Sequence, residues 1–157
     1  MVQKIAQAIV RQAKEECAQD IYFVPKDDCY ELYMRIGDER RFIQTYDFDQ
    51  LAAVISHFKF LAGMNVGEKR RSQLGSCDYR YDDKETSIRL STVGDYRGYE
   101  SLVIRLLHDE ETELKFWFTH FPEFREKFKD RGLYLFSGPV GSGKTTLMHQ
   151  LAQLKFK

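Results

Sequence analysis

The nine residues GPVGSGKTT, at positions 138 to 146, have the composition of a loop that binds phosphate groups. Gly141 and Gly143 can adopt backbone angles closed to other residues, so successive amides can turn inward around an anion. The spacing satisfies the pattern GxxxxGK[ST], between the apolar run LYLF and residues of helical periodicity. The candidate nucleotide-binding residues are therefore Gly138, Pro139, Val140, Gly141, Ser142, Gly143, Lys144, Thr145 and Thr146.

Each polar side chain of this loop has an expected role. Lys144 should reach the β- and γ-phosphates of ATP, and the Thr145 hydroxyl should bind Mg²⁺, while Thr146 should support the first helical turn. Hydrolysis also needs a carboxylate for the metal and a group that orients water, which in most such enzymes follow the loop in sequence. Because no further strand follows the loop here, we expect half of a catalytic site and no turnover by this chain.

The residues before the loop predict an α+β unit. Apolar residues three and four apart predict amphipathic helices at 2–17 and 49–64, the second capped by Asp47 or Asp49 and stopped near Gly63. We expect the first two strands to form a hairpin and the last two to pair antiparallel. Alternating and apolar runs predict strands at 20–25, 29–36, 40–46, 77–82, 86–93 and 100–107.

The predicted domains are 1–107, a linker with a junction helix at 108–130, and the start of a nucleotide-binding domain at 131–157. In the last of these, GLYLFS at 132–137 reads as a compact buried strand and 143–156 as a helix. Packing at a domain junction explains the linker's aromatic residues better than ligand stacking. These are Phe116, Trp117, Phe118 and Phe121.

The two parts differ in expected stability. Residues 1–107 should fold cooperatively, since the predicted elements can bury a core of their own. Residues 133–157 should be marginal, because no neighbouring strands cover their leucines. The leucines concerned are Leu133, Leu135, Leu147 and Leu151.

Composition excludes several classes of protein. The 157 residues are 43% hydrophobic and carry 24 basic against 24 acidic side chains, so no overall field attracts nucleic acid or an anionic membrane. Cys17, Cys29 and Cys77 are far apart and in no CxxC pair, which argues against disulfides and a zinc site and for reduced thiols in a cytosolic protein. The N-terminus lacks the apolar core of a signal peptide.

Other residues that could do chemistry have simpler explanations. His57 and His108 lack partners at metal-ligand spacing and are expected to be solvated or core histidines. The pairs Asp82-Asp83 and Glu110-Glu111 are expected to be exposed turn charges, and Tyr22 to be a packing residue.

Five motifs in order resemble the secretion ATPases, which drive type II secretion, type IV pilus assembly and DNA-uptake pseudopili. AQDIYFVP resembles ASDIHxxP, and MRIGDE resembles RxDG with Gly37 and Asp38 transposed. KFLAGMNVGEKRRSQLGS resembles KxxAGLDIxExRxPQDGR, and IRLSTVGDYRGYESLVIRLL resembles RxSTxPTxxGExxVxRxL. GLYLFSGPVGSGKTTLMHQL resembles the family's strand and phosphate loop.

The departures from these motifs point to one branch of the family. Ser72, Leu74 and Ser76 replace the family's Pro, Asp and Arg, and the long extra N-terminal domain of larger members is absent. Both features resemble the members that serve competence, or transformation by DNA uptake, in Gram-positive bacteria.

The resemblance implies an architecture and partners. The fold would be an α+β PAS-like N-terminal domain followed by the first strand, P-loop and helix of an incomplete RecA-like α/β NTPase domain. Members assemble as hexameric rings, use ATP and Mg²⁺, and act on a membrane platform protein. The resemblance therefore implies a cytoplasmic protein peripheral to the inner face of the cell membrane, without direct contact to nucleic acid.

The resemblance also implies that N-terminal arginines approach the phosphates of a nucleotide. The matching positions are Arg71, Arg89 and Arg105, and Ser76 stands where the family usually has another arginine. A planar, permanently charged guanidinium suits this task. Alternatively, Arg71 belongs to a solvated basic run, Arg89 points outward from its strand, and Arg105 snorkels from the sheet.

Two functions remain open at this stage. The chain is either the front part of a motor ATPase that powers pseudopilus assembly, or a truncated, non-catalytic interaction domain. A small kinase is disfavoured, because such enzymes usually carry the loop near the N-terminus.

Overall fold

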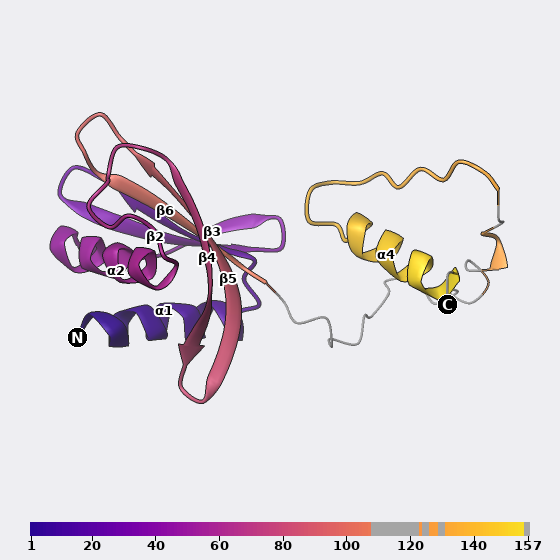
Figure 1. The fold of residues 1–157 in the computed structure, drawn as a ribbon, viewed down its shortest axis with the longest axis horizontal. Coiled ribbons are helices and arrows are strands. Elements are labelled where there is room, and N and C mark those ends of the chain that lie inside the picture. Colours follow the sequence, from indigo (N-terminus) through magenta and orange to yellow (C-terminus); the bar gives the residue numbers. More distant parts are fainter. Residues whose placement is uncertain (108–122, 124–125, 129–130, 156–157) are drawn as a thin grey trace. The chain divides into compact units, whose positions relative to one another are not determined.

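The computed structural model describes residues 1–107, 123, 126–128 and 131–155. The chain divides into two compact units, Met1–Glu110 and Glu111–Lys157, and each is described by itself. The elements of the first unit are α1 (Val2–Glu15), β1 (Asp20–Pro25), β2 (Cys29–Ile36), β3 (Glu39–Asp47), α2 (Phe48–Leu61), β4 (Gln73–Tyr81), β5 (Lys84–Gly94) and β6 (Glu100–Leu106) (Figure 1). The second unit contains α4 (Lys144–Lys155).

Both predicted helices of the first unit are confirmed, and each buries one apolar stripe. The buried residues are Ala6, Ile9, Val10 and Ala13 on α1 and Leu51, Val54, Ile55, Phe58 and Lys59 on α2. Helix α2 ends just before Gly63, which has a φ of +66°, a backbone conformation that glycine adopts at little energetic cost. Asp47 occupies the N-cap position as predicted, but its side chain makes no capping hydrogen bond.

The six strands form one antiparallel sheet in the order β3-β2-β1-β6-β5-β4. The predicted hairpin is the β1–β2 pair, and the predicted partners at 86–93 and 100–107 are β5 and β6. The first and last strands of the unit, β1 and β6, lie side by side at the centre. This pairing closes the unit around one core.

The two faces of the sheet differ in character. On the inner face, buried residues such as Phe23, Leu32 and Leu90 form a single core cluster with the apolar stripes of α1 and α2. Side chains alternate along each strand, so the residues between them lie on the opposite, outer face. Tyr22 and Val103 on that outer face are only half-buried.

The predicted start of β4 was wrong by four residues. The sequence prediction began this strand at Cys77 and left Gln73 to Ser76 in the preceding loop, where Gly75 disfavours a strand. In the structure β4 begins at Gln73, and Ser76 pairs with Arg89 of β5. The long ladder with β5 overrides the local preference of these residues.

In the second unit the helix prediction is confirmed by α4, whereas the predicted buried strand at 132–137 is wrong. Leu133 and Leu135 are 96% and 89% exposed. A strand is held by hydrogen bonds to a neighbour, and residues 131–139 pair with no strand among those the structure describes. The predicted aromatic cluster at 116–121, His108 and Glu110-Glu111 lie outside the described residues, as does most of the predicted junction helix.

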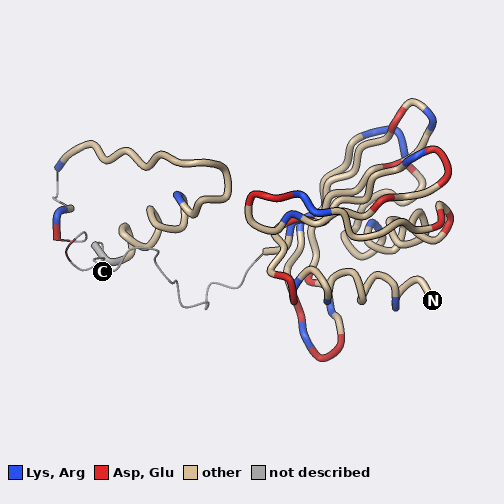
Figure 2. The backbone as a smooth tube through the Cα atoms, turned by 180° about the vertical axis from the view of Figure 1, so that it is seen from behind, with Lys and Arg blue, Asp and Glu red and all other residues tan. Residues whose placement is uncertain are grey.

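Charges of both signs are interspersed over the first unit (Figure 2). None of the described helices is long and apolar enough to span a bilayer. Within the same described part, His, Cys, Asp and Glu side chains form no group that could hold a metal ion, and all three cysteines are free thiols.

Candidate nucleotide-binding site and arginine row

The phosphate-loop candidate has the backbone that its glycines predict. Gly141 and Gly143 have φ values of +80° and +86°, a region that side-chain-bearing residues rarely enter. The Leu147 amide donates to the Gly143 carbonyl at 2.9 Å, so the first turn of α4 starts directly at the loop. A Cβ on Gly138 would lie 2.8 Å from Ser142 Oγ, so a larger residue there would require the Ser142 hydroxyl to move. These features fit a cradle for phosphate at a helix N-terminus.

The Lys144 ammonium lies against the loop itself. Its Nζ donates to the carbonyl oxygens of Gly138 at 2.7 Å and Pro139 at 2.5 Å. A phosphate oxygen would therefore compete with two carbonyls for this cation. Thr145 and Thr146 follow in the first turn of α4 and are exposed to solvent.

Two of the three predicted arginines lie directly opposite each other in the first unit. The ladders place one residue of every strand in a single line across the outer face, and we call this line the arginine row. From β4 to β3 it consists of Ser76, Arg89, Arg105, Asp20, Arg35 and Arg40. Directly opposed residues of antiparallel strands project from the same face. The row therefore joins the predicted Arg89 and Arg105 and places Ser76 beside them.

Within the row, Arg105 is held by a nearly buried carboxylate. Its Nε donates to Asp20 Oδ1 at 2.9 Å, and the Asp20 side chain is only 3% exposed whereas that of Arg105 is 64% exposed. The Tyr22 hydroxyl donates to Asp20 Oδ2 at 3.3 Å. The hydrogen bond and charge of Asp20 raise the pKa of Arg105 above its ordinary value. This bond holds the guanidinium by its Nε, while most of the Arg105 side chain remains in solvent.

The row extends beyond the predicted arginines to Arg35 and Arg40. The Arg40 guanidinium lies over two tyrosine rings, 4.8 Å from the centroid of Tyr22 and 4.4 Å from that of Tyr33. Cations stack favourably on such rings. The prediction that Tyr22 is a packing residue is thus confirmed on the outer face, where it also supports two charged neighbours.

The structure does not bring Arg71 into this row. Arg71 precedes the first residue of β4, in an exposed loop at the end of the sheet. Its backbone N–H donates to Glu68 Oε1 at 3.2 Å. The predicted site arginines therefore fall into two places within the first unit.

Comparison with known proteins identifies the lineage of this chain. The family model described as type II/IV secretion system protein matches residues 1–157. The chain belongs to this family.

Among secretion system proteins, the chain is 70% identical over 157 residues to the competence protein ComGA of Streptococcus pneumoniae, covering 100% of this chain and 50% of that protein. It is 35% identical over 149 residues to the type IV pilus assembly ATPase PilB of Thermus thermophilus, covering 91% of this chain and 17% of that protein. The chain thus spans half or less of the length of these relatives.

A solved structure shows that the fold also occurs in a distant member of the secretion machinery. The VirB11 ATPase from the Brucella suis type IV secretion system, in complex with sulphate, superposes with a TM-score of 0.50 at 14% sequence identity. The match covers 96% of this chain and 52% of that one. At this identity the likeness shows a shared fold.

Sequence reasoning missed Asp20, Arg35, Arg40 and Lys59 as functional candidates. Signals for three of them were present in the family motifs: Asp20 in AQDIYFVP, Arg35 in MRIGDE and Lys59 in KFLAGM. Spacing alone gave no reason to group Asp20, Arg35 and Arg40, because the row forms only when strands pair. Lys59 lies on α2, outside the row. No motif contained Arg40.

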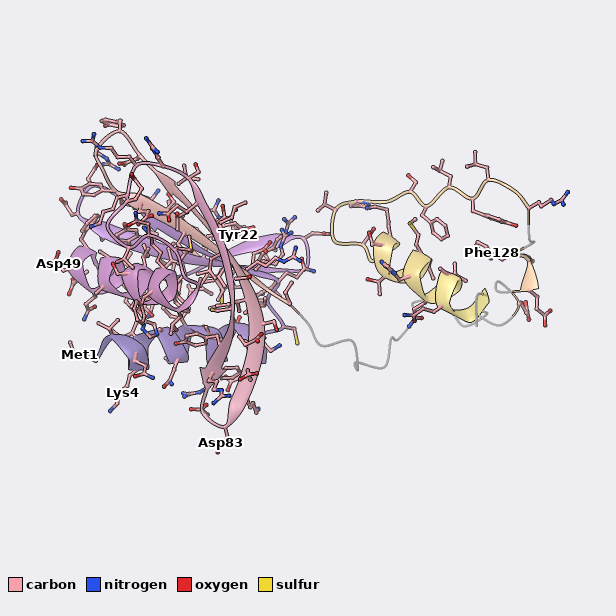
Figure 3. The ribbon with its side chains drawn as sticks, in the orientation of Figure 1. Met1, Lys4, Tyr22, Asp49, Asp83 and Phe128 are labelled. Carbon is pink, nitrogen blue, oxygen red and sulfur yellow. The ribbon has the colours of Figure 1, made fainter. Side chains whose placement is uncertain are left out.

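The remaining candidates are accounted for without catalysis. His57 is half-buried beside Phe58 and Tyr79, with ring centroids 5.8 and 6.1 Å away, and burial lowers its pKa. Asp83 lies at the exposed tip of the β4–β5 hairpin (Figure 3), as predicted for a turn charge. Asp82 beside it forms a bidentate ion pair with Arg11 of α1 at 2.6 and 2.7 Å.

Proposed function

We propose that this chain is part of a motor ATPase that powers assembly of a competence pseudopilus for DNA uptake. The observation that carries the proposal is the phosphate-loop sequence at 138–146, with positive φ at Gly141 and Gly143 and helix α4 starting at Lys144. The 70% identity to a competence protein supports the choice of pathway.

The loop residues would bind ATP with Mg²⁺. The backbone amides of the loop and the N-terminus of α4 would hold phosphate oxygens, and Lys144 would exchange its contacts to Gly138 and Pro139 for the β- and γ-phosphates. The exposed Thr145 hydroxyl would be a ligand of the metal ion, which neutralises charge on the phosphates. Thr146 would support this turn.

The arginine row would supply cations to a nucleotide. Arg89 and Arg105 project side by side from the outer face, and the bond to Asp20 restricts the orientation of Arg105. A guanidinium that is already oriented loses less entropy when it binds a phosphate oxygen. We propose the same task for Arg71 from its own loop.

The whole protein would act as an assembly. By the family resemblance we propose a hexameric ring, a PAS-like N-terminal domain and the beginning of a RecA-like motor domain. The ring would lie in the cytoplasm against the inner face of the membrane and transmit force to a platform protein, without contacting DNA itself.

The alternative is a non-catalytic interaction domain. It is favoured by the exposure of Leu133 and Leu135, which are available to a partner. Motor and interaction functions differ in their dependence on the loop, because only the motor function needs Lys144.

The test is a calorimetric titration of the chain with Mg-ATP. We expect weak binding, which Lys144→Ala abolishes and Lys127→Ala, an exposed lysine of the same unit, leaves unchanged. No sustained hydrolysis is expected, because the carboxylate and water-orienting group are not predicted in this sequence.

Two results would contradict the proposal. Equal Mg-ATP binding by the parent and Lys144→Ala would remove the loop's role, and partner binding would then become the favoured function. Sustained turnover that disappears in Lys144→Ala would show a complete catalytic site and overturn the half-site interpretation.

A further inference from the structure

The side chain of Lys59 is buried in the first unit as part of an ion pair. Its Nζ lies 2.7 Å from Glu100 Oε1, and the two side chains are 1% and 5% exposed. Lys59 belongs to the last turn of α2, and Glu100 is the first residue of β6. Removing two charges from water is costly, and an apolar pair of similar volume often serves stability equally well. The ion pair therefore calls for a role beyond packing.

The same ammonium also binds a loop. Lys59 Nζ donates to the Glu68 carbonyl oxygen at 2.7 Å. Glu68 lies in the segment 65–72, which we call the basic loop because it carries the consecutive cations Lys69, Arg70 and Arg71. One buried side chain thus ties α2, β6 and the basic loop together.

Within the basic loop, polar side chains fix the backbone. Glu68 Oε1 accepts hydrogen bonds from the amides of Arg70 at 2.7 Å and Arg71 at 3.2 Å. Gln73 Nε2 donates to the carbonyls of Asn65 and Glu68 at 3.0 Å each, and Gln73 Oε1 accepts from the Asn65 amide at 2.8 Å. The loop is therefore held at both ends and at its middle.

The backbone of the basic loop also rests on the end of β5. A Cβ on Gly94 would lie 2.1 Å from the Lys69 carbonyl oxygen and 2.8 Å from the Arg70 Cα. Gly94 pairs directly with Glu100 in the sheet. The backbone contact at Gly94 and the Lys59–Glu100 ion pair therefore both hold the basic loop at the β5–β6 end of the sheet.

The three cationic side chains themselves remain in solvent. Lys69, Arg70 and Arg71 are exposed, and their side chains form no ion pair within 4 Å in the part of the chain that the structure describes. Glu68 is the charged group beside them: hydrogen bonds from the Arg70 and Arg71 amides, and then the charges of these two arginines, lower the pKa of its carboxyl. A loop that presents cations from an ordered backbone binds an anion with a smaller entropic cost than a flexible one.

We infer that Lys59, paired with Glu100, is a positioning residue that orders the basic loop and so presents Arg71 to nucleotide phosphate. The inference rests on the proposed role of Arg71 in nucleotide binding. Lys59 itself touches no substrate. It acts indirectly, by holding the Glu68 carbonyl and so the backbone of the loop.

The experiment uses urea unfolding, amide hydrogen exchange and Mg-ATP titration of the whole chain. It compares the parent with four variants: Lys59→Met, Lys59→Met/Glu100→Met, Arg71→Ala and the control Lys4→Met. Lys59→Met should destabilise the chain, because it leaves the Glu100 carboxylate buried without its partner. In Lys59→Met/Glu100→Met both charges are removed, so stability should recover. The amides of residues 69–71 should nevertheless exchange about tenfold faster than in the parent. Lys4→Met, at an exposed lysine of α1, is the control and should change nothing.

Mg-ATP affinity distinguishes a role of Lys59 in positioning the basic loop from a role in the stability of the fold alone. The double variant should bind Mg-ATP about as weakly as Arg71→Ala does, roughly fivefold more weakly than the parent. A double variant with recovered stability and parental loop exchange would overturn the inference. If Arg71→Ala binds like the parent, the nucleotide role of Arg71 fails, while loop exchange still decides whether Lys59 orders the loop.

A further variant covers the case in which the double variant does not fold. Glu100→Gln keeps the Lys59 ammonium and its bond to the Glu68 carbonyl but removes the ion pair. We expect the loop amides to lose no more protection than the amides of β5 and β6. Selective loss of loop protection in this variant would overturn the route through the Glu68 carbonyl, because the loop would then depend on the Glu100 carboxylate.

Discussion

Arg105 on β6 donates from Nε to Oδ1 of Asp20 on β1 across 2.9 Å, at the point where the first and last strands of the sheet meet. The carboxylate is almost completely buried while the guanidinium is largely exposed. Asp20 thus gains a partner that it needs, and Arg105 gains an orientation that it could use toward an anion.

Removing Arg105 should destabilise the first unit. In Arg105→Ala the buried Asp20 carboxylate keeps, among the residues that the structure describes, only the 3.3 Å bond from Tyr22, so the free energy of unfolding should fall by about 1–3 kcal/mol. The matched control is Arg89→Ala, which removes the neighbouring exposed arginine of the row and should stay within about 0.5 kcal/mol of the parent. Urea unfolding measures both. Equal losses would show that the ion pair adds nothing specific.

Stability should fall in mildly acidic solution because of His57. Burial lowers its pKa in the folded state below the ordinary value of 6.5, and Nε2 has no hydrogen-bond partner among the described residues. Above pH 6.5 the imidazole is neutral in both states and stability is full. As pH falls from 6.5 toward the lower folded-state pKa, the unfolded chain binds a proton that the folded chain does not, so stability decreases.

The variant His57→Phe should remove this part of the pH dependence, since phenylalanine fits the apolar contacts of Phe58 and Tyr79 without titrating. His149→Gln, at an exposed histidine of α4, should retain it. Urea unfolding between pH 5 and 8 measures the difference. An unchanged slope in His57→Phe would mean that the folded state protonates His57 as readily as the unfolded chain.

Gly94, which contacts the basic loop, and Gly67, within that loop, should respond differently to substitution by alanine. Gly94→Ala should cost about 1–3 kcal/mol of stability, because the added Cβ would overlap the Lys69 carbonyl and push the loop away. At Gly67 the nearest atom, Asn65 Oδ1, would be 3.6 Å from the new Cβ, so Gly67→Ala should be nearly neutral. Thermal unfolding compares them, and similar melting temperatures would refute the close approach at Gly94.

Leucines of the two units should also contribute differently to the free energy of unfolding. Leu135 is 89% exposed and Leu32 is fully buried. Leu135→Ala should change the free energy of unfolding by less than about 0.5 kcal/mol, whereas Leu32→Ala should cost about 2–5 kcal/mol. A large loss for Leu135→Ala would show that residues 132–137 form the buried strand that the sequence predicted.

Local patterns predicted most of the secondary structure correctly. The apolar stripes of α1 and α2 and the alternation in β1, β2 and β6 arise from neighbours within one element, which a single segment of sequence contains. The prediction failed at Gln73–Ser76 and at 132–137. In both places the outcome depends on whether a distant strand is available as a partner.

The sequence by itself predicted the backbone of the phosphate-loop candidate, since the positive φ of Gly141 and Gly143 follows from residue type and local spacing. Only the tertiary structure decided that Arg89 and Arg105 stand together while Arg71 stands apart. It also revealed that Lys59 is buried against Glu100, although it looks like one more lysine of an amphipathic helix. Strand register and the burial of a charge are set by contacts between segments far apart in the chain, which no local periodicity contains.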